Sequence, residues 1–182
     1  YSTCAIGAAS CLGFSLPRNF RFPYAAIGFS DFWKRWHISL SSWLRDYLYI
    51  PLGGNRQGPT RTHVNLMLTM LLGGLWHGAS WTFVVWGGLH GLYLIGERVC
   101  VRLQGHVPFW KTNPGRLLLA GLTFVLVCFT WVFFRADTFE QAFSILRSMT
   151  GLTPAGETAT VHKSWLGVSM LCVACLFVVQ WR

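Results

Sequence analysis

One histidine in this chain has the surroundings of a reactive group. His77 stands in the run Gly-Gly-Leu-Trp-His-Gly over residues 73–78, just after an apolar stretch that predicts a helix. An α-helix rises about 1.5 Å per residue, so His77 would lie roughly 21 Å beyond His63, well inside a hydrocarbon core about 30 Å thick. An ionisable side chain at such depth usually faces a cavity or a partner, and glycines let helices or a substrate approach it. We therefore predict that His77 is functional; a structural hydrogen bond between helices is the alternative.

The other five histidines have weaker indications of function. His90 ends the run Trp-Gly-Gly-Leu-His and precedes a glycine. It lies about 20 Å from His77 if the intervening residues are helical, and we expect a structural role for it. His37 lies among tryptophan and leucine side chains, so its helix could turn it toward the His77 cavity. The remaining three are expected at solvated positions: His63, His106 and His162.

The composition predicts that helices in a membrane position these residues. Of the 182 residues, 53% are apolar and only 12% are charged, about half the usual share of charge. We expect an all-α fold, a multi-pass transmembrane helix bundle with interfacial amphipathic helices. The chain begins at Tyr1 and is apolar at both ends, so residues 1–182 are expected to be one membrane domain cut from a longer protein. Its expected parts are an interfacial helix over 30–50, a hairpin over 63–96 that carries His77, and transmembrane helices over 117–134 and 165–181.

The basic residues are distributed as in a membrane protein. Residues 17–61 carry seven Lys and Arg and residues 97–116 carry four, against three over 135–163. This bias places the first two segments on the cytoplasmic side. A nucleic-acid surface would need a soluble face to display its charge, so no nucleic-acid partner is expected despite the net charge of +9. No metal site is expected either, because the pair Cys172 and Cys175 lies in an apolar segment without a second such pair.

Two ordered motifs resemble those of a known family. Residues 32–55 read Phe-Trp-Lys-Arg-Trp-His-Ile-Ser-Leu-Ser-Ser-Trp-Leu-Arg-Asp-Tyr-Leu-Tyr-Ile-Pro-Leu-Gly-Gly-Asn and resemble the signature of membrane-bound O-acyltransferases. Residues 73–78 resemble the segment that holds the invariant histidine of that family, and Trp81, residues 86–91 and residues 133–136 are also similar to it. The likeness is strongest to the bacterial branch that serves alginate O-acetylation, whose relatives act on peptidoglycan and on the D-alanylation of teichoic acid.

The resemblance implies a membrane acyltransferase with a central funnel, longer than this chain. It implies that His77 is the catalytic histidine and that His37 matches a second family histidine near the tunnel. It also implies a multi-pass protein of the bacterial inner membrane, in contact with membrane lipid. No bound cofactor is expected: acetyl-coenzyme A or another acyl thioester would be the donor, and a hydroxyl of an exported polysaccharide such as alginate the acceptor. A separate extracytoplasmic acetyltransferase is the expected partner.

The implied chemistry assigns roles to individual side chains. The imidazole of His77, with an ordinary pKa of about 6.5, would take the acceptor proton while the acceptor oxygen attacks the thioester. Lys34, Arg35, Arg45 and Trp76 are expected to bind the donor or line its tunnel, although headgroup contact would also explain the basic residues. The alternative function is a non-catalytic scaffold or a transporter component of a polysaccharide export complex.

Overall fold

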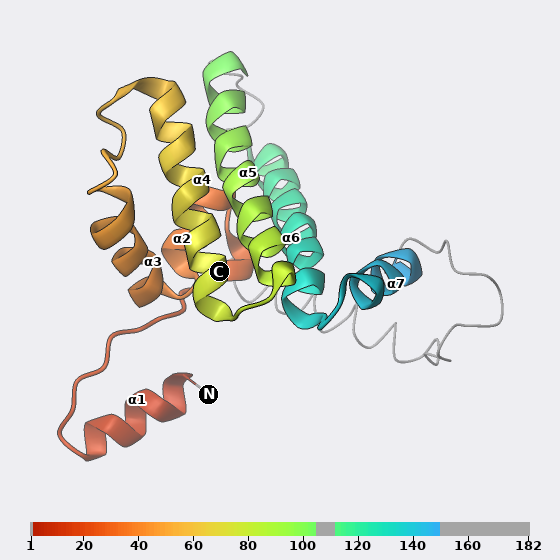
Figure 1. Ribbon diagram of the computed structural model, residues 1–182. Coiled ribbons are helices and arrows are strands. Elements are labelled where there is room, and N and C mark those ends of the chain that lie inside the picture. The colour runs from red at the N-terminus through yellow and green to blue at the C-terminus, as the bar shows by residue number, and fades with distance from the viewer. Residues whose placement is uncertain (1, 105–111, 150–182) are drawn as a thin grey trace.

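The computed structural model describes residues 2–104 and 112–149, and within these ranges every element of secondary structure is a helix. This agrees with the expected all-α class. The transmembrane helix predicted over 165–181 lies outside the described residues. Figure 1 shows the helices in chain order: α1 (Ser2–Cys11), the 3₁₀ turn η1 (Pro23–Ala25), α2 (Phe29–Arg35), α3 (Ile38–Leu44), the π-helical η2 (Arg45–Tyr49), α4 (Gly58–His77), α5 (Trp81–Gln104), α6 (Asn113–Arg135) and α7 (Phe139–Met149).

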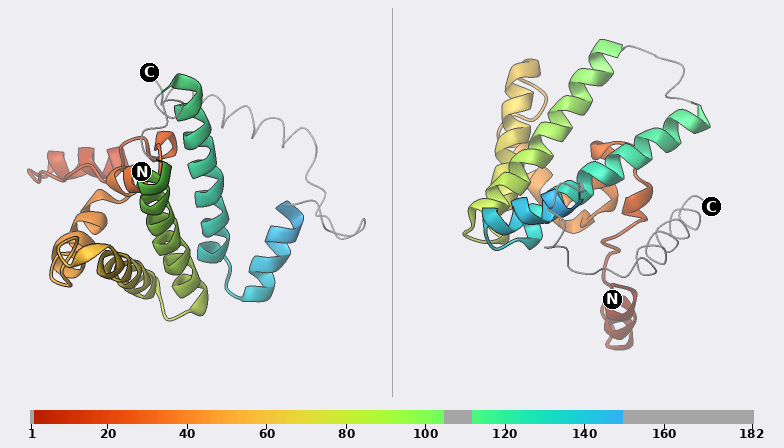
Figure 2. Two further views of the ribbon diagram at one scale, coloured as in Figure 1. Left: turned by 90° about the horizontal axis from the view of Figure 1, so that it is seen from above. Right: turned by 90° about the vertical axis from the view of Figure 1, so that its right-hand side faces the viewer.

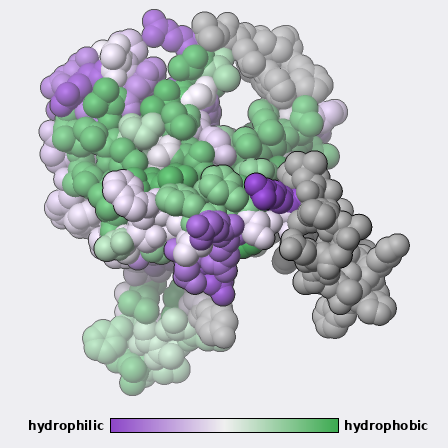
Figure 3. All heavy atoms as spheres, turned by 45° about the vertical axis from the view of Figure 1, so that its right-hand side comes forward, coloured by the Kyte–Doolittle hydropathy of each residue, from purple (hydrophilic) through white to green (hydrophobic). Residues whose placement is uncertain are grey.

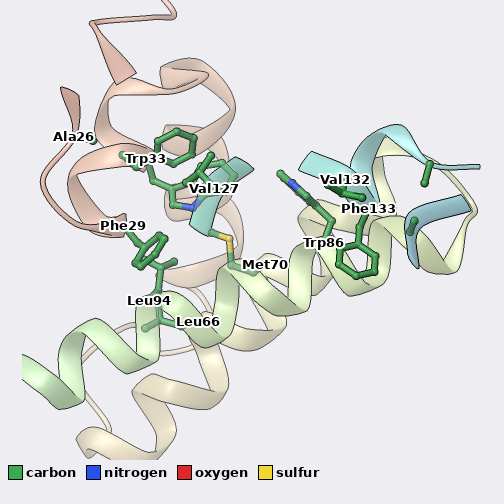
Figure 4. Close-up of a cluster of buried hydrophobic side chains, with 13 residues drawn as sticks. Ala26, Phe29, Trp33, Leu66, Met70, Trp86, Leu94, Val127, Val132 and Phe133 are labelled. Atoms are coloured by element: carbon green, nitrogen blue, oxygen red, sulfur yellow. The ribbon is translucent and has the colours of Figure 1, made fainter. Parts of the chain in front are cut away.

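Three long helices form the centre of the molecule. α4 and α5 are the arms of a hairpin, α6 lies along α5, and α2 packs against α5 (Figures 1 and 2). The hairpin expected over residues 63–96 is therefore observed, and both of its arms are longer than expected. The buried core lies where α2, α5 and α6 meet, and Figure 4 shows Trp33, Trp86 and Val127 from these three helices within one cluster.

The α4–α5 hairpin depends on two glycines at which the helix backbones meet. A Cβ atom added to Gly87 would lie 2.3 Å from the carbonyl oxygen of Met70, and one added to Gly74 would lie 2.3 Å from the carbonyl oxygen of Phe83. Both distances are far shorter than any real Cβ contact, and backbone atoms cannot move aside as a flexible side chain can. The glycines therefore allow an approach of the two helices that no larger residue permits.

We expect Gly87→Ala to destabilise the hairpin by about 1–3 kcal/mol, because the added methyl group forces α4 and α5 apart. Gly121→Ala in α6 is the matched control, since nothing lies within 4 Å of the added Cβ and alanine favours a helix by about 1 kcal/mol over glycine. Thermal unfolding of the detergent-purified protein measures both. Equal unfolding temperatures for the two variants would contradict the role of the close approach.

The segment over residues 30–50 is not the single interfacial helix expected from its periodicity. α2 ends at Arg35, and α3 begins at Ile38 after a break in which His37 has a φ of 43°. The loop at Asn19 replaces the missing helical hydrogen bonds: its carbonyl oxygen accepts from the Ile38 amide at 3.0 Å, and its Oδ1 accepts from the Ser39 amide at 2.9 Å. The prediction of one continuous helix was wrong because a long-range backbone contact, invisible to periodicity, competes with the helix at this point.

Polar contacts with α5 and α6 fix the start of α2. The Ser30 amide donates to Oε2 of Glu97 on α5 at 2.9 Å, and the Gly28 amide donates to Oγ1 of Thr123 on α6 at 3.0 Å. These two acceptors satisfy amides that have no partner within the first turn of a helix. The Trp-Lys-Arg-Trp-His motif is thereby held at one position on the long helices.

Polar contacts also hold the end of the longer motif over residues 32–55. Nδ2 of the fully buried Asn65 on α4 donates to the carbonyl oxygen of Gly54 at 3.1 Å. Oδ1 of Asn55 accepts from Nη1 of Arg98 on α5 at 2.9 Å and also from the Tyr49 hydroxyl. The turn after η2 is therefore tied to both arms of the hairpin.

One helix of the described ranges is long and apolar enough to cross a membrane, and it is α6. α4 and α5 are also long enough, but they are less apolar because they include polar residues such as Arg61 and Asn65 in α4 and Glu97 and Arg98 in α5. Much of the visible surface is nevertheless apolar (Figure 3), and large side chains such as Leu117, Leu122 and Val125 of α6 are exposed. An outward apolar face of this kind suits contact with lipid or with further helices.

Candidate active site

His77 is the last residue of α4 and lies in an aromatic cage built from three helices. Its ring centroid is 5.2 Å from that of Trp86 on α5 and 5.0 Å from that of Phe134 on α6. Both rings meet the imidazole edge to face, and Trp76 of α4 does the same at 5.1 Å. The side chain is half-buried rather than enclosed. His77 thus has apolar walls and an open side from which a reactant could approach.

The turn after His77 keeps the cage compact. Gly78 ends α4, and its amide donates to the carbonyl oxygen of Leu75 at 3.2 Å. A Cβ atom at Gly78 would lie 2.8 Å from the ring of Phe83, whose centroid is 6.2 Å from that of His77. The glycines around His77 therefore bring neighbouring groups close to the imidazole, as expected from the sequence.

His37 approaches the same region from the break between α2 and α3. His37 contributes to the electrostatic environment of His77. His37 is half-buried, its ring lies 6.1 Å from that of Phe20, and its Nδ1 is buried with no hydrogen-bond partner among the described residues. The two histidines that the sequence singled out thus interact electrostatically, whereas their ring contacts are with different aromatic residues.

His90 occupies the most enclosed position of the three. It is fully buried, and its ring packs against Trp33 at 5.2 Å and Trp86 at 4.8 Å. Its Nε2 lies 3.0 Å from Oγ1 of Thr130 on α6. This hydrogen bond joins α5 to α6, the kind of structural role expected for His90. Trp86 contacts both His77 and His90, so His90 helps to position one wall of the cage.

Comparisons with known proteins identify the family. Residues 1–136 match the model of MBOAT, the membrane-bound O-acyltransferase family. The chain belongs to this family. It is 48% identical over 180 residues to a probable alginate O-acetylase AlgI of Pseudomonas putida, a match that covers 97% of this chain and 36% of the relative. It is 45% identical over 152 residues to a peptidoglycan O-acetyltransferase of Helicobacter pylori, covering 84% of this chain and 28% of the relative.

A more distant relative is named for the transfer of a D-alanyl group rather than an acetyl group. A teichoic acid D-alanyltransferase of Bacillus subtilis is 28% identical over 151 residues, which cover 78% of this chain and 38% of the relative. The chain spans about a third of the length of the curated relatives it matches. The family assignment covers both histidine-bearing motifs, because His37 and His77 lie within the matched residues.

The structure separates the side chains that the sequence grouped as expected donor-binding residues. Lys34 and Arg35 line one cavity. Arg45 lies apart on the exposed side of η2, where it donates from Nε to Asp46 at 2.7 Å and holds the pKa of that carboxyl below its usual value. Trp76 is 62% exposed, with its ring against His77. The expected roles of these four residues in donor binding stay predictions.

Sequence reasoning missed the aromatic walls of the cage. Trp86 and Phe134 were noted only as parts of motifs, and Phe83 not at all. No local pattern marks them, because their meeting point depends on how α5 and α6 pack. An aromatic residue in each of three consecutive apolar segments is the signal that could have suggested a shared contact.

We expect Thr130→Val to lower the free energy of unfolding by about 1–3 kcal/mol, because buried Nε2 of His90 then has no partner. Thr69→Val is the matched control: Thr69 is also buried, but its hydroxyl only donates back to the Asn65 carbonyl within α4. Thermal unfolding of the purified variants gives the comparison. If Thr69→Val lowers the free energy of unfolding as much as Thr130→Val does, the hydrogen bond to His90 is not the cause of the loss.

Proposed function

We propose that the protein to which this chain belongs moves an acyl group, most simply acetyl, from a cytoplasmic thioester donor toward a hydroxyl of an exported cell-surface polysaccharide. The observation that carries this proposal is the half-buried imidazole of His77, held by aromatic rings from three helices and lying within electrostatic range of His37. Family membership supports acyl transfer in general. The names of the relatives support a polysaccharide acceptor, with alginate first among them.

The proposed reaction needs one proton acceptor and one site that excludes water. The neutral imidazole of His77 takes the proton of the acceptor hydroxyl while that oxygen attacks the thioester carbonyl carbon. The tetrahedral intermediate then collapses, the carbon–sulfur bond breaks, and the imidazolium returns the proton to the departing thiolate. The rings of Trp86 and Phe134 limit the access of water, and so reduce hydrolysis of the thioester.

The proposal also places the protein in a membrane and gives it a partner enzyme. The apolar outer face of α6 and the excess of basic residues over 17–61 fit a multi-pass protein of a bacterial inner membrane with the donor on the cytoplasmic side. A separate extracytoplasmic acetyltransferase would complete the transfer to the exported polymer, so the hydroxyl that accepts the acyl group at His77 would belong to an intermediate carrier. The proposal requires no bound cofactor, since the thioester is a substrate.

Replacing His77 by Gln in the full-length protein should lower thioester turnover by about 10²- to 10⁴-fold, the usual contribution of a general base. The purified protein is assayed with acetyl-coenzyme A, and the O-acetyl content of the polymer is measured in cells. His63→Gln on the same helix is the control, because His63 has no part in the cage. Turnover near wild type at normal protein levels would refute the assignment of His77. Failure of the wild-type protein to turn over any thioester would favour a scaffold or transporter.

His37 allows the imidazole to be tested separately from the backbone. Its φ of 43° is costly for most residues but free for glycine, so His37→Gly should keep the break between α2 and α3 while removing the side chain. If the imidazole positions the donor or stabilises charge, turnover should fall on the order of 100-fold with little change in thermal stability. A variant that is stable and fully active would reduce His37 to a structural residue.

A further inference from the structure

A cavity of about 780 Å³ lies near His37, between α1, the loop after it and α2. Its lining is strongly basic. Four cationic side chains reach it, against one carboxylate, that of Asp31. The four are Arg18, Arg21, Lys34 and Arg35. The cavity therefore has a surplus of positive charge that attracts an anion.

The positive charge is largely unneutralised within the protein. Asp31 accepts from Nε of Arg35 at 2.9 Å and from the Ile27 amide at 3.0 Å, so its carboxylate is already engaged. Arg18, Arg21 and Lys34 have no side-chain hydrogen bond or ion pair to the rest of the described chain. Three cations are thus left to bind a ligand from outside.

The cavity shares a wall with the proposed active site. Phe20 lines it, and its ring lies 4.9 Å from Trp36 and 6.1 Å from His37. Asn19 also lines it and makes the hydrogen bonds that hold the break beside His37. A ligand anchored in the basic cavity would lie next to the segment that fixes His37, which in turn lies within electrostatic range of His77.

We propose that this cavity binds phosphate groups, with Arg18 and Arg21 as ligands alongside Lys34 and Arg35. Guanidinium groups match phosphate oxygens with paired hydrogen bonds, and the volume lies within the range of pockets that hold small molecules. The wall shared with His37 favours the phosphates of a coenzyme A-type donor, and this choice of ligand rests on the proposed acyl transfer. A phospholipid headgroup has the same chemistry and is the other source.

The test measures binding, so that it does not depend on catalysis. The full-length protein in phospholipid-free detergent is titrated with coenzyme A, dephospho-coenzyme A and pantetheine. Arg18→Ala/Arg21→Ala should weaken coenzyme A binding by at least about tenfold, with a smaller effect on pantetheine, which has no phosphate. Arg61→Ala is the matched control: an exposed arginine of α4 that does not line the cavity. Binding of coenzyme A should also weaken as ionic strength rises.

The lipid source is tested with the same variants. Phosphatidylglycerol that stays bound through purification is measured by mass spectrometry. If the double variant binds coenzyme A normally but, unlike Arg61→Ala, loses this lipid, the cavity is a phosphate site whose ligand is a lipid headgroup. If neither ligand distinguishes the double variant from Arg61→Ala, the inference is overturned.

His77→Gln separates this inference from the proposed function. It should bind coenzyme A as the wild type does, because His77 does not line the cavity. Normal turnover by His77→Gln would refute the catalytic assignment while leaving the phosphate site intact. Normal coenzyme A and lipid binding by Arg18→Ala/Arg21→Ala, together with loss of turnover in His77→Gln, would refute the phosphate site alone.

Discussion

The backbone contact between α4 and α5 at Gly74 and Gly87 is the constraint on which the rest of the structure depends. Helices that pack through ordinary side chains keep their axes about 8–10 Å apart, and a residue larger than glycine at either position would collide with a carbonyl oxygen of the opposite helix. The close crossing comes a few residues before His77 and brings Trp86 of α5 against its ring. It leaves the other side of α5 for α6 and α2, which add Phe134 to the cage and Trp33 to the core beneath it.

The three histidines of this region differ because their surroundings differ. His90 is buried among aromatic rings, and its Nε2 forms a hydrogen bond with Thr130, so it joins α5 to α6. His77 has similar aromatic neighbours but lies at a helix end, where one side of the ring is open. His37 lies at a backbone break that the Asn19 loop maintains. Enclosure suits a structural histidine, whereas an open side beside apolar walls suits one that exchanges a proton with a reactant.

In the proposed reaction, donor binding and acyl transfer would take place in different parts of the molecule. Cationic side chains line the cavity between α1 and α2, and aromatic side chains surround His77. A donor that carries phosphates at one end and a thioester at the other would fit this order, since its charged end gains from the cations and its reactive end from the exclusion of water. Arg45 is paired with Asp46 on an exposed face and does not line the basic cavity.

The sequence by itself determined the helical class, the hairpin that carries His77 and the two motifs that mark the family, because these depend on local periodicity, glycine placement and residue order. It did not reveal the break at His37, since the competing hydrogen bonds come from Asn19, which is distant along the chain. It singled out His37 and His77, but not the ring contacts around His77, among them that of Phe134. Those contacts, and the meeting of Arg18 and Arg21 with Lys34 and Arg35, were decided only by tertiary packing, because they join segments whose separation in space no local pattern encodes.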